Sequence, residues 1–493
     1  TECKHSRGFI FHLSCWCLEE VMAKIVDIQV LDIRFPTSLE SHGSDAMHTD
    51  PDYSCAYVIL TTSSGLKGHG FTFTTGRGTE VVVAAVQALS RHIEHRTLDS
   101  IYENFASLWR ELTSDTQLRW LGPEKGVVHL ATAALINALW DLWGKIQGKP
   151  VWKLLADMSP EKIVSLMDFR YISDMLTKEE ALDILRSKQS SAAEREKDLV
   201  QNGYPAYNTS VGWLGYTDGQ IRKLCQEAVK DGFTSFKVKV GRDLVDDKRR
   251  LAVVRHLVGS HCKLASECDS HFVISSTTIF SFSFFFFFFL LFQMVDANQY
   301  WDIKEAIYWT KELSNFDLHW IEEPTSPDDI LGHATIAKAL QPMGIRVATG
   351  EQCHNRVMFK QFLQADALQF CQIDSCRLGG VNEILSVILM AAKKEVPVCP
   401  HAGGVGLCEL VQHLSYWDYV SVSGTQENRV LEYVSHLHEH FKTPVVIKNG
   451  RYMPPQAPGY SSEMWESSIE KYQFPEGLVW KKLLASGHYK KAF

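Results

Sequence analysis

Six side chains that can carry acid–base and metal chemistry stand along the chain at a nearly regular interval. They are Lys239, Asp296, Glu322, Glu351, Asp374 and His401, separated by 57, 26, 29, 23 and 27 residues. The first interval falls to 28 when an unusual 29-residue stretch, 265–293, is set aside. Carboxylates can hold a divalent cation, and an amine and an imidazole can exchange protons with a substrate. The spacing therefore indicates one metal-assisted acid–base site built from repeated units.

The three carboxylates of the central group are predicted ligands of Mg²⁺. Asp296, Glu322 and Glu351 follow consecutive apolar runs, and hard oxygen ligands with room for water and substrate oxygens suit this cation. The alternative is that they pair with loop lysines. For a single acid at a strand end, pairing with a lysine is the better interpretation. For three such acids in succession, metal binding is the better one.

Two lysines, Lys237 and Lys239, alternate with valine in FKVKV, so both are expected to point into the protein. Burial and mutual repulsion are expected to lower the pKa of an amine toward a value useful for a general base. The alternative is a salt bridge to a carboxylate of a neighbouring strand.

His401 and Asp374 are predicted to form a pair in which the carboxylate accepts one imidazole N–H and fixes the tautomer. A lone histidine is more often structural, but this one is expected opposite the lysines and beside the metal. With a substrate carboxylate neutralised by Mg²⁺, Lys239 would remove the α-proton, and Lys237 would help to hold the enediolate. His401 would then protonate a departing β-hydroxyl, which is a dehydration that yields a 2-keto-3-deoxy acid.

The elements that position these residues are predicted strands, each followed by a helix-like segment. The runs are SFKVKV, MVD, LHWIEE, IRVATGE, LQFCQID and VPVCPH. Repeated strand–helix units with chemistry at the strand ends predict an α/β fold with a (β/α)8-type barrel. A first barrel strand is expected near VSLMDF, 164–169, and the loop 204–216 is expected near the barrel mouth.

The remaining sequence predicts a second domain of the α+β class ahead of the barrel. Strand-like runs occur at 25–33, 53–62 and 66–73, and helical periodicity at 79–94, 99–111 and 127–147. We therefore divide the chain into a capping domain at 22–150, a barrel at 151–450, and a C-terminal segment at 451–493 that returns to the capping domain. Residues 1–21 are interpreted as an N-terminal extension. They contain Lys4 and Arg7 but also Glu2, Glu19 and Glu20, which a mitochondrial presequence usually avoids, so both a cytoplasmic and a mitochondrial location stay open.

Composition narrows the classes of partner. The formal net charge of −8 and a pI near 6.2 argue against nucleic acid or an anionic membrane as the main ligand. The 12 cysteines show no CxxC pair, which favours free thiols over a disulfide framework. A small molecule is the expected partner, and association into a homo-oligomer is an open option for a barrel of this size.

The stretch 265–293 interrupts the regular interval and has an unusual composition. It includes FVISSTTIFSFSFFFFFFLLF, which is long enough to cross a bilayer. A span here would place Lys239 and Glu322 on opposite sides of a membrane, which argues against one. Phe, Ser and Leu are encoded by pyrimidine-rich codons, and the stretch ends in Gln, as a translated 3′ end of a retained intron would. We therefore interpret 265–293 as an in-frame splicing or gene-prediction product that would damage folding where it is present.

The K-x-K pair, the three successive acids and the Asp–His pair resemble the enolase superfamily, in its mandelate racemase branch. Longer stretches, among them HGSDAMHTDPDYS, WIEEPTSPDDILGHA and CPHAGGVGLCELVQHL, resemble the L-fuconate dehydratases of that branch. The resemblance extends from Met22 to the C-terminus except for 265–293. It implies an enolase-like modified TIM barrel that binds Mg²⁺ and dehydrates an acid sugar, with L-fuconate as the best candidate.

The resemblance also implies roles for individual residues. Lys239 would be the base, with His401 and Asp374 as the second acid–base pair, and Asp296, Glu322 and Glu351 would bind the metal. The implied substrate contacts are Gly43, Ser44, Asp45, Tyr53, Lys237, Glu351, His401, Ala402, Gly403 and Glu432. The alternatives are another sugar-acid dehydratase, a racemase or epimerase of the same superfamily, or a catalytically dead splice product.

Overall fold

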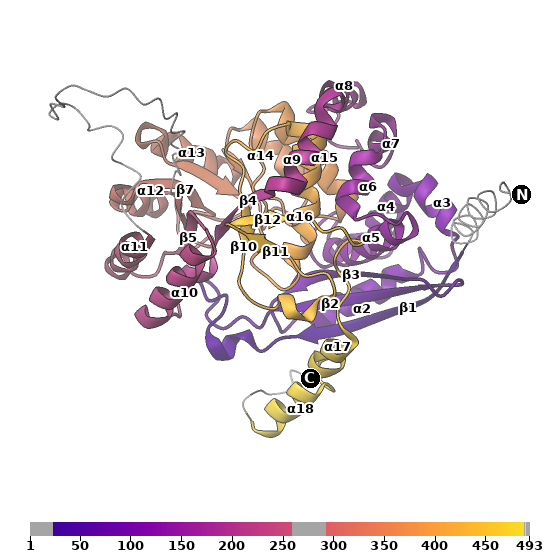
Figure 1. Cartoon of the computed structure of the whole chain (residues 1–493), viewed down its shortest axis with the longest axis horizontal. Coiled ribbons are helices and arrows are strands. Elements are labelled where there is room, and N and C mark those ends of the chain that lie inside the picture. The colour runs from indigo at the N-terminus through magenta and orange to yellow at the C-terminus, as the bar shows by residue number, and fades with distance from the viewer. Residues whose placement is uncertain (1–22, 259–291, 488, 490–493) are drawn as a thin grey trace, which may run out of the picture.

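The computed structural model describes residues 23–258, 292–487 and 489. The N-terminal extension 1–21 therefore lies outside the described residues, and so does the stretch 265–293 apart from Phe292 and Gln293. Figure 1 shows the barrel beside a three-stranded sheet, with the two last helices on the far side of that sheet.

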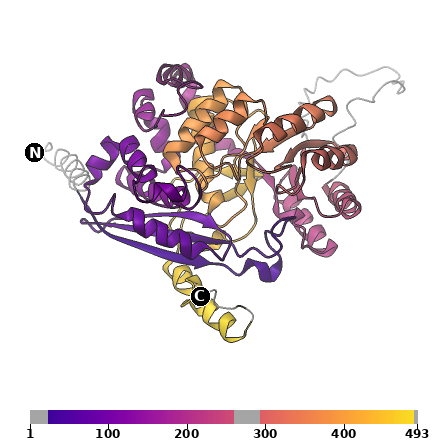
Figure 2. The ribbon, with the colours of Figure 1, turned by 180° about the vertical axis from the view of Figure 1, so that it is seen from behind.

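The N-terminal part of the chain forms an antiparallel sheet in the order β1-β2-β3, with helices packed on it. Figure 2 shows these helices against the sheet from behind. The close contact between β3 and the long helix α5 requires glycine, because a Cβ on Gly70 would lie 2.2 Å from the backbone nitrogen of Ala138. The elements are β1 (Ile25–Arg34), β2 (Ser54–Thr62), β3 (Lys67–Thr74), α2 (Thr79–Ser90), α3 (Leu98–Glu103), α4 (Phe105–Thr113) and α5 (Gly126–Ile146). The predicted strands and helices of this region are confirmed, with the second helix divided into α3 and α4.

Helix α5 has the length and apolar composition of a membrane span, and among the described residues it is the one helix that does. Its most apolar window is 83% buried inside the protein. The helix runs between the three-stranded sheet and the barrel helix α15 (Val381–Lys393), which explains its apolar surface on nearly every side.

Four helices follow before the barrel begins: α6 (Val151–Asp157), α7 (Pro160–Ser165), α8 (Lys178–Lys188) and α9 (Ala192–Asn202). The predicted first barrel strand at 164–169 is wrong. Pro160 occupies the first turn of α7 and the Ser159 side chain accepts a hydrogen bond from the Lys162 backbone N–H, so local capping starts a helix that ends at Ser165, and 166–169 form turn and loop. The first barrel strand is instead β4 (Tyr204–Asn208), inside the segment that was expected to be a loop.

The barrel strands follow β4 in sequence order and pair in parallel. They are β5 (Ser235–Lys239), β6 (Phe292–Asp296), β7 (Leu318–Glu322), β8 (Arg346–Thr349), β9 (Phe370–Cys371) and β10 (Leu431–Tyr433). A bridge from Cys371 to Val398 adds the segment between β9 and β10, and β10 returns to pair with β4. Eight strand positions therefore surround one core, and the predicted (β/α)8-type barrel with an α+β capping domain is confirmed.

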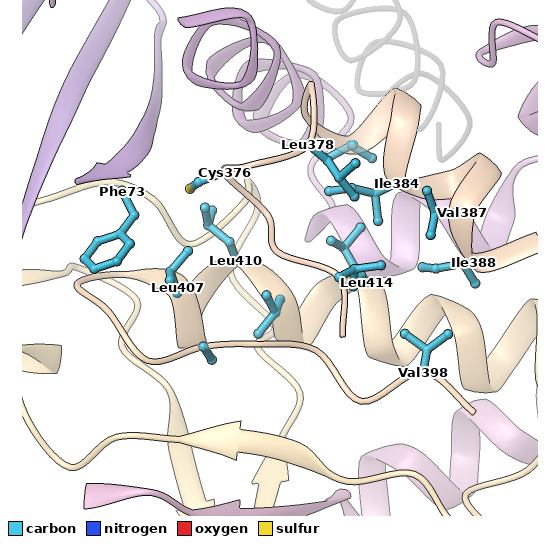
Figure 3. Close-up of a cluster of buried hydrophobic side chains, with 14 of the residues drawn as sticks. Phe73, Cys376, Leu378, Ile384, Val387, Ile388, Val398, Leu407, Leu410 and Leu414 are labelled. Atoms are coloured by element: carbon cyan, nitrogen blue, oxygen red, sulfur yellow. The ribbon is translucent and has the colours of Figure 1, made fainter. Parts of the chain in front are cut away.

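Helices connect the successive strands on the outside of the barrel. They are α10 (Asp218–Lys230), α11 (Leu244–Val258), α12 (Ile303–Glu312), α13 (Ile330–Leu340), α14 (Arg356–Gln364), α15 and α16 (Leu407–Trp417). Figure 3 shows Ile384, Val387 and Ile388 of α15 facing Leu410 and Leu414 of α16. Phe73 of β3 lies at one end of this cluster, so the packing continues from the barrel helices to the capping sheet.

The two faces of the barrel strands carry different side chains. Tyr207, Met294, Trp320, Ala348, Phe370 and Cys399 fill the interior. Gln293 alternates with Met294 and so lies on the opposite, helix-facing side of β6. It is 3% exposed, and within the described ranges 23–258, 292–487 and 489 neither its amide oxygen nor its amide nitrogen has a hydrogen-bond partner.

The C-terminal segment contacts strand β1 of the N-terminal sheet. It contains β11 (Val446–Lys448), β12 (Arg451–Met453), α17 (Glu466–Tyr472) and α18 (Leu478–Ala485). The Trp480 indole N–H donates to the Arg34 carbonyl over 2.8 Å, and the Phe474 backbone N–H donates to the Asp32 carbonyl over 2.8 Å. The cysteines in the described part of the chain are free and buried.

Candidate active site

The six predicted chemical residues lie at the carboxyl ends of the barrel strands. β5 ends at Lys239, β6 at Asp296 and β7 at Glu322, and the parallel register places these three side by side. The others stand just beyond their strands: Glu351 follows β8, Asp374 follows β9, and His401 follows the segment at Val398. Lys239 and His401 come from strands separated by β6, β7, β8 and β9, so they approach the barrel mouth from different sides.

Lys237 occupies the centre of the buried acids. Its Nζ lies 2.5 Å from Glu322 Oε1, 2.7 Å from Glu432 Oε1 and 3.3 Å from Asp296 Oδ2. Lys239 is one pleat further along and pairs with Asp296 Oδ2 over 2.5 Å. Both lysines point inward, as their alternation with valine predicted.

The expected lowering of the lysine pKa values is wrong for this state of the protein. Burial does act to lower them, but the surrounding carboxylates outweigh burial and raise the pKa of both amines. The negative charge of Asp296 is the main cause that raises the pKa of Lys239, whereas the positive charge of Lys237 acts to lower it. The salt-bridge alternative therefore describes the lysines here, and both carry a charge.

The site contains more buried acid than its ammonium groups neutralise. Burial, together with Asp296 and Glu432, raises the pKa of Glu322 to about 8 despite its contact with Lys237. Glu323 is also buried, and burial and Glu351 raise its pKa well above the usual range. One oxygen of Glu323 has no hydrogen-bond partner among the residues that the structure describes. This surplus of buried carboxylate is the charge pattern that a bound cation would balance.

The chemistry of the donor set suits Mg²⁺, because Asp296, Glu322 and Glu351 offer carboxylate oxygens from three consecutive strands. Within the described part of the chain, no three acidic, histidine or cysteine side chains are already grouped as a metal site. The ammonium groups of Lys237 and Lys239 stand among the acids instead. A cation at these carboxylates would compete with the two lysines for the same oxygens.

His401 and Asp374 form the predicted pair. Imidazole Nδ1 lies 2.7 Å from Asp374 Oδ2, and the other oxygen of Asp374 accepts the backbone N–H groups of Cys376 and Arg377. His401 Nε2 lies 3.5 Å from Glu351 Oε2. Burial acts to lower the pKa of His401, but Glu351 and Asp374 raise it to about 9. The imidazolium can therefore serve as a proton donor.

Glu432 links the last strand to the loop that carries His401. Its Oε2 accepts the Ala402 N–H over 2.8 Å, while its Oε1 pairs with Lys237. The Gly403 N–H approaches His401 Nε2 at 3.1 Å. Glu432, His401 and Gly403 line the same pocket, and Ala402 acts through its backbone.

The loop between β1 and β2 covers the barrel mouth from the capping domain. Gly43, Asp45 and Tyr53 line the pocket with Lys239, Glu351 and His401. Gly43 has φ of +75°, and a Cβ there would lie 2.4 Å from the Tyr53 hydroxyl, so this approach favours glycine. Ser44 does not line this pocket. Its side chain accepts the Gly215 N–H over 2.8 Å and thereby ties the loop to the barrel.

Several pocket residues were missed by the sequence interpretation. His48, Trp213, Asn298, Gln352 and Arg377 line the pocket beside the predicted set. His48 falls within HGSDAMHTDPDYS, and Asn298, Gln352 and Arg377 fall within VDANQYWD, ATGEQCHNRV and QIDSCRLGGVNE, which also resemble the family. Trp213 lies on the turn after β4, and only the expectation that 204–216 approaches the mouth pointed to it.

The barrel has eight strand positions and carries acids, lysines and an Asp–His pair at its strand ends. An α+β domain covers its mouth. This combination defines an enolase-like two-domain protein. Residues 33–156 match the family described as "Mandelate racemase / muconate lactonizing enzyme, N-terminal domain". Residues 292–468 match the family described as "Enolase C-terminal domain-like". The chain therefore belongs to the enolase superfamily.

Relatives cover almost the whole chain. It is 60% identical to human mitochondrial enolase superfamily member 1, over 94% of this chain and 99% of that protein. A crystal structure of the human protein superposes with a TM-score of 0.87 at 59% identity, over 94% of this chain and 99% of that one. L-galactonate dehydratase of Hypocrea jecorina is 50% identical over 91% of this chain and 94% of its own. L-talarate/galactarate dehydratase of Salmonella typhimurium, solved with Mg and L-lyxarohydroxamate, shares the fold at 21% identity and a TM-score of 0.67, over 92% of this chain and 94% of that one.

Proposed function

We propose that this protein is a Mg²⁺-dependent hydro-lyase that dehydrates an acid sugar, with L-fuconate as the preferred candidate. The observation that carries the proposal is the placement of an amine and a charged imidazole at one pocket that also holds the surplus of buried carboxylate. Relatives named as dehydratases of L-galactonate and of talarate or galactarate support the reaction class. The choice of L-fuconate rests on the resemblance of the long sequence motifs.

The proton transfers are assigned to residues on different sides of the mouth. Lys239 takes the α-proton of the substrate, and the electron pair moves into the carboxylate to give an enediolate. Lys237 stays protonated and stabilises this charge. The enediolate then re-forms its C=O bond while the β-carbon loses its hydroxyl, which takes a proton from His401 and leaves as water. The enol product becomes a 2-keto-3-deoxy acid by tautomerisation.

Lys239 must lose its proton before it can act as a base, and its pairing with Asp296 opposes this. Asp296, Glu322 and Glu351 are the residues that would hold Mg²⁺. When bound, the ion supplies Lewis-acid stabilisation of the substrate carboxylate and balances the carboxylates that the two ammonium groups balance here. Asp374 keeps the His401 ring in place during the cycle by holding Nδ1.

The test is a screen of acid sugars with the purified chain, with the chain lacking 265–293 run in parallel. Formation of 2-keto-3-deoxy acid is measured with Mg²⁺ and with EDTA. We expect metal-dependent turnover with L-fuconate among the best substrates. Turnover that persists in EDTA, or full activity in Lys239→Ala, would contradict the proposal. If another acid sugar were strongly preferred, the proposed enzyme class would be supported and the choice of L-fuconate would be wrong.

Racemisation or epimerisation is the second candidate, because an amine and an imidazole on different sides can exchange one proton from two faces. In D₂O, deuterium in recovered substrate with the hydroxyl retained would favour it. The dead splice product is a third reading, in which 265–293 prevents metal binding. It predicts that only the shortened chain is active and gains thermal stability with Mg²⁺.

A further inference from the structure

We infer that His48 is a substrate-binding residue that donates a hydrogen bond to a hydroxyl of the sugar beyond its reacting carbons, and so selects for chain length. The inference rests on the proposed function, because it assumes that the pocket binds an acid sugar. It assigns a role to a residue that neither the sequence motifs nor the acid–base geometry required.

A buried carboxylate on the same loop fixes the His48 ring. Asp45 is 6% exposed, and its Oδ1 accepts the backbone N–H groups of Met47 over 2.7 Å and His48 over 2.6 Å. The His48 Nδ1 lies 3.1 Å from Asp45 Oδ2. The backbone turn and the ring are therefore held by one acid, which gives the imidazole a defined direction at low entropic cost.

The other ring nitrogen, Nε2, is left for a ligand. His48 lines the pocket together with Lys239, Glu351 and His401, and its side chain is 49% exposed. Within the described ranges, the hydrogen bonds and ion pair of the ring run through Nδ1 to Asp45. A sugar bound in this pocket would cover that exposed surface.

The surroundings of the ring favour its protonated form, in which Nε2 carries a hydrogen for a hydroxyl or another acceptor oxygen. The hydrogen bond to Asp45 raises the pKa of His48, burial opposes this, and the charges of Asp45 and Glu351 raise it further. Lys239 acts in the opposite direction from across the pocket. The raised pKa favours the protonated ring, and a hydrogen bond from a protonated ring is stronger than one from a neutral ring, so this contact can carry specificity.

The position of His48 points to the distal part of the substrate. Lys239 and His401 stand at strand ends and are assigned to the carbons that lose a proton and a hydroxyl. His48 belongs instead to the capping-domain loop between β1 and β2, which approaches the same pocket from outside the barrel. A six-carbon acid sugar carries hydroxyls past its third carbon that this loop can meet, whereas a four-carbon acid has only one.

The experiment compares wild type with His48→Gln against substrates of two lengths. The constants measured are kcat and KM for the best six-carbon acid sugar, and the inhibition constant of a four-carbon acid sugar against it. We expect His48→Gln to raise KM for the six-carbon substrate about tenfold or more, which is the range for loss of one hydrogen bond from a charged group. The inhibition constant of the four-carbon acid should change less than twofold. Asp45→Asn should also raise KM for the six-carbon substrate, because it weakens the contact that holds the His48 ring.

Two controls keep the result specific. His354→Gln alters a partly exposed histidine that lines a different pocket, and it should leave both constants unchanged. Unchanged thermal midpoints of the variants would show that the loop still folds. This inference would be overturned if His48→Gln changed KM for the six-carbon substrate and the inhibition constant of the four-carbon acid equally, or changed neither. Either result would leave the proposed function intact. Absence of turnover by wild type with any acid sugar would overturn the proposed function, and this inference with it.

Discussion

A buried charge cluster outside the proposed catalytic set joins the N-terminal helices to the barrel, and its central acid gives a quantitative prediction. Glu383 of α15 accepts hydrogen bonds from the ring of His129 on α5 over 2.5 Å and from the Arg356 backbone N–H over 2.9 Å. Arg356 Nη1 lies 3.2 Å from Glu383 and 2.8 Å from Glu124 of the capping domain. We predict that Glu383→Gln weakens the attachment of the two domains.

The magnitude follows from the pKa of the carboxyl. Burial raises the pKa of Glu383, but His129 and Arg356 outweigh burial and lower it from 4.5 to about 2. Each step of one in pKa is worth about 1.4 kcal/mol, so the ionised form contributes about 3 kcal/mol of stability. Removal of one partner from a buried ion pair typically costs about 3–5 kcal/mol, which agrees.

The pH dependence has a defined sign. Because the pKa is lower in the folded protein, the contribution is fully present above about pH 4.5 and is lost as the pH falls toward 2. Chemical denaturation of wild type and Glu383→Gln at pH 7 should differ by about 3 kcal/mol, and the difference should shrink between pH 5 and pH 3. Glu179→Gln, on the exposed face of α8, is the matched control and should match wild type at both pH values.

Two results would refute this reasoning. A loss below about 1 kcal/mol at pH 7 would show that His129 and Arg356 are satisfied without the carboxylate. A loss that stayed constant down to pH 3 would show that packing, and not ionisation, is responsible for the effect.

Three further outcomes are expected at and beside the pocket. Lys239→Met should lower kcat by about 10²–10⁴-fold and abolish exchange of the substrate α-proton with D₂O. His401→Asn should lose dehydration but keep that exchange, and proton NMR measures both reactions. Arg250→Met should lower kcat about tenfold or more with little change in KM, because the buried guanidinium holds the Lys239 and Gly212 carbonyls over 2.7 Å each. Mg²⁺ at 100 times its dissociation constant should stabilise wild type by about 2.7 kcal/mol, and Glu322→Gln should lose most of that shift in a thermal scan.

The barrel and most of the site were predictable because strand-end chemistry repeats at a regular interval. Lys239, Asp296 and Glu322 end their strands as the apolar runs indicated. The first barrel strand was misplaced because the mostly apolar run 164–169 does not show its conformation by composition, and the Ser159 and Pro160 start signal places its first two residues in the short helix α7, with turn and loop after them. The lysine charge state was also missed, since Lys237 meets acids from three different strands whose convergence is a property of the closed barrel.

The unpaired amide of Gln293 bears on the origin of the long phenylalanine-rich stretch. Among the residues that the structure describes, the buried Gln293 amide has no hydrogen-bond partner, and such an amide costs about 1–3 kcal/mol. If messenger RNA lacked the codons for 265–293, Leu264 would be joined to Met294, and an aliphatic side chain would take the place of that amide. In that shorter sequence only positions 259–262 would separate the end of α11 from the start of β6, a length common for such connections. The junction thus falls where the shorter chain retains the register of Asp296 opposite Lys239 and gains a side chain that suits its surroundings.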